Sequence, residues 1–333
     1  MAVKPRSNRK KVIVIVLCVL LVLLLAAGVV ISNILFDFAL NPNGAFTMTD
    51  LFASGEVEPT PQEEPVTDLE KRVREFGEKA QAWFEAEGRP VELIREDAEV
   101  RRGSFFANEG HGYVIACHGY GGNSSQMASS ALKFFELGYS VLTPDAVAHG
   151  ESDGKYYGMG WLEREDILGW IDAIVEHDPE ARIVLFGISM GGATVMMVSG
   201  EELPNNVKCI IEDCGYSSVW DEFALQLDTL FHMPPFPLLY MADLACQVRA
   251  GYGLKEASAV DQLKKATVPM LFIHGEEDTF VPYAMLDVVY DACASAQKEK
   301  LTIPGAGHGE AGSVDPDTYW GAISAFLEKH VEF

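Results

Sequence analysis

An unbroken apolar run near the amino terminus constrains this chain more than any other feature of its sequence. No charged residue occurs from Val12 to Ile31, and the next charge downstream is Asp37. A helix needs about 20 apolar residues to cross the hydrocarbon core of a bilayer. The run therefore predicts a transmembrane helix over residues 12–36.

A cleaved secretory signal is the alternative interpretation of this run. Such signals have an apolar core of about 7 to 15 residues that ends at a small-residue cleavage site. Here the small residues Ala26 to Gly28 lie inside a longer run, which favours a permanent span and leaves cleavage open. The head of residues 1–11 is basic (Lys4, Arg6, Arg9, Lys10 and Lys11), so the positive-inside rule places it in the cytoplasm. We expect a single-pass protein of the cell membrane with an extracytoplasmic catalytic domain.

The charge balance excludes one class of partner. The chain has 25 Lys and Arg against 49 Asp and Glu, a formal net charge of −24, and the basic cluster lies before the span. A surface this acidic repels the phosphates of nucleic acids. We therefore expect no nucleic-acid partner.

The cysteines after the span do not form a metal-binding or disulfide pattern. They are odd in number and include no C-x-x-C pair, so neither a zinc site nor a disulfide framework is indicated. We expect most of them to be small buried apolar residues on strands. Their positions are Cys117, Cys209, Cys214, Cys246 and Cys293.

Residues 37–66 predict an acidic, proline-containing linker between membrane and domain. Prolines at positions 42, 59, 61 and 65 and the scarcity of large apolar residues argue against packed structure from residue 41 to 65. Thr67 and Glu70 then form a capping-box pattern that opens a helix. The folded domain is expected to cover residues 67–333.

From Val91 onward, short β-rich runs alternate with helical stretches, a pattern typical of βαβ units in a mostly parallel, doubly wound sheet. Eight strands are expected, the first two as a hairpin, with helices between the others. The long interval between the sixth and seventh strands predicts a helical cap over residues 216–266. Its apolar stretch Met233–Met241 could dip into a bilayer, although a core-facing cap is favoured. The expected strands are residues 91–95, 100–106, 113–117, 140–143, 183–186, 209–212, 270–274 and 301–303, and the expected helices are 125–137, 162–177, 191–199, 283–294 and 316–330.

The stretch Gly187-Ile188-Ser189-Met190-Gly191 follows an expected strand and precedes an expected helix. This context makes it a G-x-S-x-G nucleophile elbow, with Ser189 at the sharp turn. Side chains at the two glycine positions would collide with the neighbouring strand and helix. Ser189 is therefore the candidate nucleophile.

A serine nucleophile needs a base, and the base needs an acid that orients it. His308 lies in a glycine-rich loop after the last expected strand, and Asp278 follows the preceding strand. The order Ser, Asp, His along the chain is that of this hydrolase architecture. Glu277 and Asp213 are competing candidates for the acid.

The developing negative charge of acyl transfer must be met by fixed main-chain donors. The first is the N–H of Met190, directly after the nucleophile. The second is expected from the glycine-rich turn after the third strand, His118-Gly119-Tyr120-Gly121-Gly122, and is assigned to Tyr120.

Five stretches taken together resemble the α/β-hydrolase superfamily: residues 118–123, 144–152, the serine elbow, 274–278 and 305–308. Within it, residues 236–308 are similar to bacterial membrane-anchored serine hydrolases of uncertain substrate. The resemblance implies an eight-stranded sheet with a helical cap and hydrolysis of carboxylic esters or related acyl compounds, with no metal and no organic cofactor. One departure is Ala146-Val147-Ala148, where relatives often have an arginine-containing turn.

The leading hypothesis is a serine esterase that acts on a small-molecule or lipid ester through an acyl-enzyme on Ser189. A peptidase or acyltransferase acting on envelope substrates is a second hypothesis. A catalytically inactive, membrane-tethered binding module is a third. The sequence indicates neither the natural substrate nor the oligomeric state.

Overall fold

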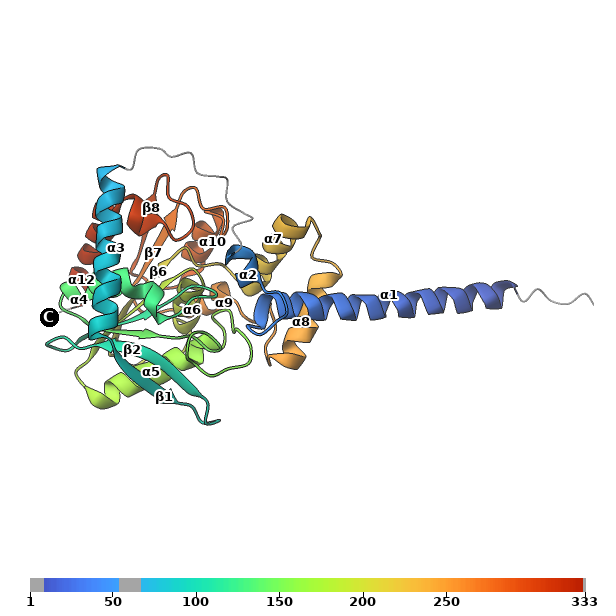
Figure 1. Ribbon diagram of the computed structural model, residues 1–333, viewed down its shortest axis with the longest axis horizontal. Helices are drawn as coiled ribbons and strands as arrows, with labels where there is room; N and C mark the ends of the chain where they lie inside the picture. The colour runs from blue at the N-terminus through green and yellow to red at the C-terminus, as the bar shows by residue number, and fades with distance from the viewer. Residues whose placement is uncertain (1–8, 54–66, 332–333) are drawn as a thin grey trace, which may run out of the picture.

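The computed structural model describes residues 9–53 and 67–331. Its first helix, α1 (Arg9–Leu40), extends away from the rest of the molecule (Figure 1). By length and composition, residues 11–40 of this helix can cross a membrane. Its side chains are exposed from Lys11 to Ala27 and become increasingly buried toward Leu40. The predicted span of residues 12–36 lies within α1.

The linker prediction is wrong for the part of the linker that the structure describes. Helix α1 continues to Leu40, and a second helix, α2 (Met48–Ala53), follows it. Phe36, Leu40 and Met48 are each less than 5% exposed, because they pack against the folded domain. Burial of these few apolar side chains stabilises packed structure here, although the composition of the segment is largely polar. Residues 54–66, which hold three of the four linker prolines, lie outside the described residues.

The domain is built on one sheet of eight strands in the order β1-β2-β4-β3-β5-β6-β7-β8. β1 and β2 form the expected antiparallel hairpin, β2 also pairs antiparallel with β4, and all other pairs are parallel. The predicted eight-stranded, mostly parallel sheet is thus confirmed. The strands are β1 (Arg89–Ile94), β2 (Val100–Phe106), β3 (Gly112–Cys117), β4 (Ser140–Pro144), β5 (Arg182–Ile188), β6 (Val207–Asp213), β7 (Met270–Gly275) and β8 (Lys298–Ile303).

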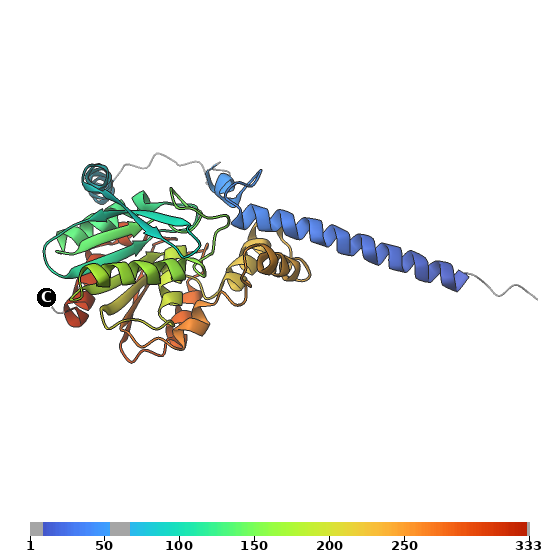
Figure 2. The ribbon, with the colours of Figure 1, turned by 90° about the horizontal axis from the view of Figure 1, so that it is seen from below.

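Helices cover both faces of the sheet, and each face has its own apolar core (Figures 1 and 2). Alternate residues of β3 show the division: Val114 and Ala116 belong to one core, and Ile115 and Cys117 to the other. The first core is completed by α3 (Asp68–Glu87), α4 (Ala128–Glu136), which follows the short 3₁₀ helix Ser124–Met127, α11 (Ala311–Val314) and α12 (Pro316–His330). The second is completed by α5 (Glu163–His177), α6 (Met190–Val198), α9 (Ala259–Leu263) and α10 (Ala284–Ala292).

The interval between β6 and β7 contains two longer helices, α7 (Val219–Phe231) and α8 (Leu238–Arg249). Both lie beside the end of α1 that is nearest the domain (Figures 1 and 2). On α8, Leu239 and Ala242 are buried, whereas Tyr240, Leu244 and Val248 are exposed. The cap therefore has a core-facing side and a separate exposed apolar side.

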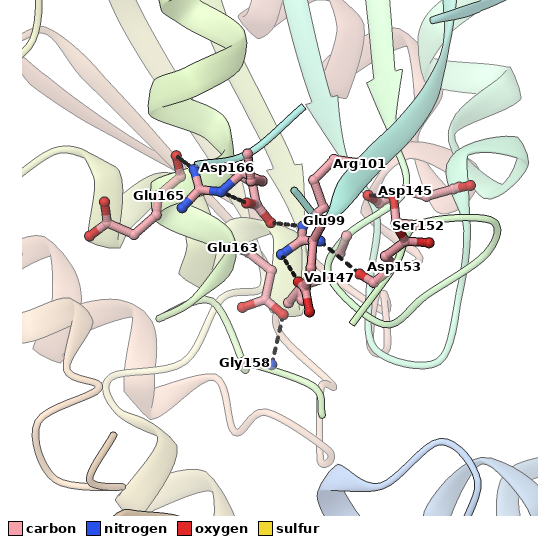
Figure 3. A network of polar contacts seen from close by, with 12 residues as sticks. Glu99, Arg101, Asp145, Val147, Ser152, Asp153, Gly158, Glu163, Glu165 and Asp166 are labelled. Carbon is pink, nitrogen blue, oxygen red and sulfur yellow. Dashed lines mark hydrogen bonds and ion pairs between the residues drawn. The ribbon is translucent and has the colours of Figure 1, made fainter. Parts of the chain in front are cut away.

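A buried polar network secures the loop between β4 and α5 (Figure 3). Arg101 on β2 donates to Asp166 (2.7 Å) and to the main-chain oxygen of Asp153 (2.8 Å). Glu163 accepts the N–H groups of Gly158 (2.9 Å) and Gly160 (2.7 Å), while burial raises the pKa of Glu163 to about 7. The network holds this loop in place, and His149 of the loop contacts the candidate active site.

Candidate active site

Ser189 occupies the sharp turn between β5 and α6. Its φ of +58° and ψ of −119° are a strained conformation for a residue with a side chain. The flanking glycines make the turn possible, because a Cβ at Gly187 would collide with the main chain of Gly191, and one at Gly191 with that of Cys117. The Ser189 N–H donates to the main-chain oxygen of Asp213 (2.8 Å), which ties the turn to β6. The physical reason given for the two glycines is thus confirmed.

The structure brings the three predicted side chains of the triad together from the ends of three strands. His308 lies in the loop after β8, with its Nε2 2.8 Å from Ser189 Oγ and its Nδ1 2.8 Å from Asp278 Oδ2. His308 and Ser189 are half-buried, while Asp278 is buried. A neutral imidazole in this position carries its proton on Nδ1 and presents the lone pair of Nε2 to the hydroxyl.

Asp278 is held as a carboxylate by several donors. Its Oδ1 accepts the N–H groups of Phe280 and Val281, each at 2.9 Å, and its Oδ2 faces His308. Burial alone would raise its pKa, but hydrogen bonds from His274 and His308 outweigh this effect and lower the pKa to about 2. The carboxylate is therefore ionised throughout the neutral range.

The two competing acids lie elsewhere. Glu277 is exposed to solvent. Asp213 is buried and accepts a hydrogen bond from the Tyr319 hydroxyl (2.8 Å), and burial raises its pKa to about 6. In the described residues, Asp278 is the only carboxylate hydrogen-bonded to His308.

His274 is a contributor to the site that sequence reasoning missed. Its Nε2 lies 2.9 Å from the main-chain oxygen of Val281 and 3.3 Å from Asp278 Oδ2. Burial opposes its protonation, but its bonds to Asp278 and Val281 raise its pKa. The sequence feature that indicates this role is the position of His274 near the end of β7, four residues before Asp278.

The two candidate oxyanion donors border Ser189, the candidate nucleophile. Met190 follows Ser189 directly, and a Cβ at Gly119, next to Tyr120, would lie 3.5 Å from that of Ser189. Within residues 67–331, neither the Tyr120 nor the Met190 N–H has a hydrogen-bond acceptor. Such free donors are available to a developing oxyanion.

Two buried histidines hold the loop that carries Tyr120. His118 bonds to the main-chain oxygen of Gly119 (2.7 Å) and accepts the Ala146 N–H (3.0 Å). His149 accepts the Gly121 N–H (3.2 Å). Burial lowers the pKa of both rings, that of His149 to about 3, so both are neutral at pH 7.

The end of α1 contacts the same loop. The Tyr120 hydroxyl donates to the main-chain oxygen of Ala39 (2.7 Å), and the Tyr157 N–H donates to that of Leu40 (2.9 Å). The Tyr157 ring stacks on His149, with 3.9 Å between ring centroids. The last turn of the apolar helix is thus bonded to the loop that carries the candidate oxyanion donor Tyr120.

A groove of about 820 Å³ lies near the candidate site, and no triad side chain lines it. It runs between α3, α4 and α12 and reaches Ile188 and Gly309, the sequence neighbours of Ser189 and His308. Arg72, Lys79 and Lys133 also line it.

Cys214, Asp278 and His308 lie close enough to one another to be tested as a metal site. The donor chemistry does not fit one. Asp278 and His308 already bond to each other, and burial raises the pKa of the Cys214 thiol well above its usual value, which opposes the thiolate that a metal needs. Like Cys214, the other cysteines after the span are buried, as predicted, but of these five residues just Cys117 and Cys209 lie on strands.

The comparisons with known proteins agree with this geometry. Residues 108–227 and 240–311 match the protein-family model described as serine aminopeptidase, S33. Because the match covers more than half of the chain, the chain belongs to this family of α/β hydrolases.

Individual relatives extend the comparison. The uncharacterized protein YqkD of Bacillus subtilis is 29% identical over 180 residues, which are 54% of this chain and 59% of YqkD, less than two thirds of that relative. A monoacylglycerol lipase of Mycolicibacterium smegmatis is 24% identical over 228 residues, or 59% of this chain and 81% of the lipase. The Pyrococcus furiosus esterase Pf2001 matches with a TM-score of 0.60 and 22% identity, covering 74% of this chain and 93% of the esterase. This structural likeness supports the fold.

Proposed function

We propose that the protein is a serine hydrolase that cleaves carboxylic esters through an acyl-enzyme on Ser189. The observation that carries the proposal is the pair of hydrogen bonds that join Asp278 to His308 and His308 to Ser189, each 2.8 Å long. Esterase and lipase names among the relatives support ester substrates.

Each group in the proposed mechanism has a defined role. His308 Nε2 takes the proton of Ser189 Oγ as that oxygen attacks the ester carbonyl, and the Asp278 carboxylate orients the ring and stabilises the imidazolium. The main-chain N–H groups of Tyr120 and Met190 donate to the oxyanion. His308 then protonates the departing alcohol, and a water activated by the same ring hydrolyses the acyl-enzyme.

We also propose that α1 anchors the enzyme in the cell membrane as a single pass, with the catalytic domain extracytoplasmic. Its length and composition support the span, and the basic residues before Val12 support the orientation. Protease accessibility of the catalytic domain in intact cells tests the orientation, since protection until lysis would reverse it.

The catalytic proposal is tested by turnover of p-nitrophenyl butyrate by full-length protein in mild detergent. Ser189→Ala should lower kcat by several orders of magnitude with an unchanged Tm, because the nucleophile is absent while the fold is kept. Ser104→Ala is the matched control, since Ser104 lies on β2, outside the groove and without contact to the triad. Full turnover by Ser189→Ala would overturn the assignment.

A peptidase or acyltransferase acting on envelope substrates is the second candidate. The description of the matching family model, serine aminopeptidase, supports the peptidase activity. Matched ester and amide substrates, assayed with and without an added acceptor alcohol, separate the activities. A non-catalytic binding module would turn over none of them.

A further inference from the structure

The outer side of helix α8 carries a row of exposed apolar side chains. Tyr240, Leu244 and Val248 follow one another at steps of four residues and are 49%, 61% and 78% exposed, and Phe236 just before the helix is 73% exposed. A contiguous exposed apolar surface on a folded domain marks a site of contact with another molecule or with a membrane. We call these four side chains the α8 stripe.

The α8 stripe points away from the folded domain. Leu239, Ala242 and Cys246 are the buried residues of the helix. At about 3.6 residues per turn, they lie roughly 140 to 160° around the helix from Leu244. The domain therefore packs on one side of α8, and the stripe occupies the opposite side.

Helix α8 crosses α1 near the end of α1 that is closest to the domain (Figures 1 and 2). Met241 packs on Gly28, where a Cβ would lie 2.6 Å from the Met241 sulfur, and Arg249 donates to Asp37 (2.6 Å). Gly28 belongs to the uncharged run of residues 12–31, and Asp37 is the first charge after that run. Helix α8 is thus held at the height where the proposed span meets the membrane surface.

The two helices are arranged so that the α8 stripe faces the direction in which α1 extends. In Figure 1, α8 lies across α1, which runs outward from the domain. Met241 and Arg249, which contact α1, lie on the helix between its buried side and the stripe. With the domain behind it and α1 beside it, the stripe faces the side on which the membrane helix leaves the domain. A helix that crosses a span in this way lies along the plane of the bilayer.

Aromatic and cationic groups border the stripe at Tyr240. Lys255 Nζ lies 4.0 Å from the ring centroid of Trp220 and 4.6 Å from that of Tyr240, and the two rings are 4.8 Å apart. Trp and Tyr are enriched where membranes meet water, and a lysine side chain there extends its charge toward the headgroups. The border of the stripe therefore has the composition of a surface that lies among lipid headgroups.

A second group of exposed aromatic side chains lies at the same height. The Phe38 ring of α1 contacts the rings of Phe46 and Phe231, with centroids 5.8 and 5.9 Å away. Phe46 is 57% exposed and Phe231 at the end of α7 is 43% exposed. Because Phe38 directly follows Asp37, this group also lies just beyond the apolar run. Exposed apolar side chains thus gather around the point where α1 leaves the domain.

A phospholipid bilayer is the occupant that these observations favour. The stripe lies beside the proposed span in the same chain, so the bilayer that holds α1 reaches it without any further partner. A second copy of the chain is the alternative. The formal net charge of −24 on each copy opposes the close approach of two such surfaces, whereas lipid acyl chains carry no charge.

We propose that α8 lies in the surface of the bilayer that α1 spans, with the α8 stripe buried about 5–10 Å into the boundary between headgroups and acyl chains. The inference rests on the proposed anchoring by α1 and extends it, because the domain is then docked on the membrane as well as anchored. Ser189, Asp278 and His308 follow the carboxyl ends of strands, as the cap does. Docking therefore turns the edge of the sheet that holds the candidate active site toward the membrane surface.

The test measures the depth of single nitroxide labels on full-length protein in phosphatidylcholine vesicles. Cys18→Ala is the background, since the other five cysteines are buried. Collisions of the label with oxygen, which concentrates in hydrocarbon, are compared with collisions with a water-soluble nickel chelate. For a label at Leu244→Cys, the ratio of oxygen to nickel collisions should exceed the ratio at Leu137→Cys several-fold. Equal ratios at the two positions overturn the proposal.

Leu137→Cys is the matched control, because it makes the same change on an exposed side chain that should stay in water. Leu137 is 40% exposed and lies just before β4, at the edge of the sheet opposite to the cap. Val248→Cys, on the same stripe, takes the place of Leu244→Cys if that variant does not fold. The expected and the contradicting results are then the same.

A label at Val22→Cys, within the apolar run of α1, separates this inference from the anchoring proposal. A high ratio at Val22 with a low ratio at Leu244 keeps the anchor and overturns the docking of α8. Low ratios at both positions overturn the anchor and the docking together. The readout needs no turnover, so it stands whether or not the protein hydrolyses esters.

A second copy of the chain on the stripe would give a different signal. The label at Leu244→Cys would then be shielded from both oxygen and nickel, and labels on neighbouring copies would broaden each other's spectra. This result would also overturn the proposal. We expect spectra that do not change when labelled protein is diluted with unlabelled protein.

Discussion

Asp278→Asn should abolish most turnover while leaving the fold intact, and the hydrogen bonds of Asp278 show why. Oδ1 accepts two main-chain N–H groups, from Phe280 and Val281, so the amide oxygen of asparagine must take this position. The NH₂ group then takes the place of Oδ2 and faces His308 Nδ1, at present 2.8 Å away. Two donors cannot share this contact, so the ring proton moves to Nε2.

The position of this ring proton determines how far kcat falls in Asp278→Asn. With Nε2 protonated, His308 presents a donor to Ser189 Oγ and cannot accept its proton, and kcat should fall by about 10⁴. KM should change by less than about threefold, since no atom of Asp278 reaches the substrate side of the ring. The assay is initial-rate hydrolysis of p-nitrophenyl butyrate at pH 7, with Tm measured on the same preparation.

Glu277→Gln is the matched control, because it makes the same chemical change one residue away on an exposed side chain. It should retain wild-type kcat. If Asp278→Asn kept more than about a tenth of the wild-type kcat, or Glu277→Gln lost as much as Asp278→Asn, the assignment of the orienting acid would be wrong.

Three further predictions concern the elements that support the site. Tyr120→Phe removes the bond to Ala39 but keeps the main-chain donor, so kcat/KM should fall by at most about tenfold; a loss near that of Ser189→Ala would place the hydroxyl in the chemistry. Gly191→Ala pushes a Cβ into the main chain of Cys117 and should lower Tm by several degrees or prevent folding; an unchanged Tm would contradict the close packing at the elbow. The pKa of Glu163 is raised by burial from 4.5 to about 7, so the folded state binds this proton more tightly than the unfolded chain. The contribution of Glu163 to the free energy of unfolding should therefore fall by up to about 3 kcal/mol as pH rises from about 4.5 to 7. Denaturant titrations of wild type and Glu163→Gln across this range measure it, and parallel pH curves for the two proteins would refute it.

Elements that depend on interactions within a few residues could be predicted from local sequence patterns. The elbow is such a case, because Gly187 and Gly191 are required by collisions within one turn. The capping box of Thr67 and Glu70 at the start of α3 is another, and the structure contains both of its hydrogen bonds. Strand boundaries were less exact at the edges of the sheet. β8 begins at Lys298, three residues before the prediction, because its first three residues are polar and half-buried or exposed.

The contacts that sequence reasoning missed join residues far apart in the chain. Tyr120 bonds to Ala39, 81 residues away, and Arg249 to Asp37, 212 residues away. Neither contact leaves a periodic or motif-like trace in the sequence. The first half of the linker was misjudged for the same reason, since Leu40 and Met48 are isolated apolar residues whose partners only the fold reveals.

The most direct measurement of the central claim is the intact mass of the folded, full-length protein after reaction with a fluorophosphonate, followed by peptide mapping. The account predicts one adduct per chain on Ser189, slowed strongly in His308→Ala and absent in Ser189→Ala. Failure of folded wild-type protein to react, or an adduct on another serine that persists in Ser189→Ala, would contradict it.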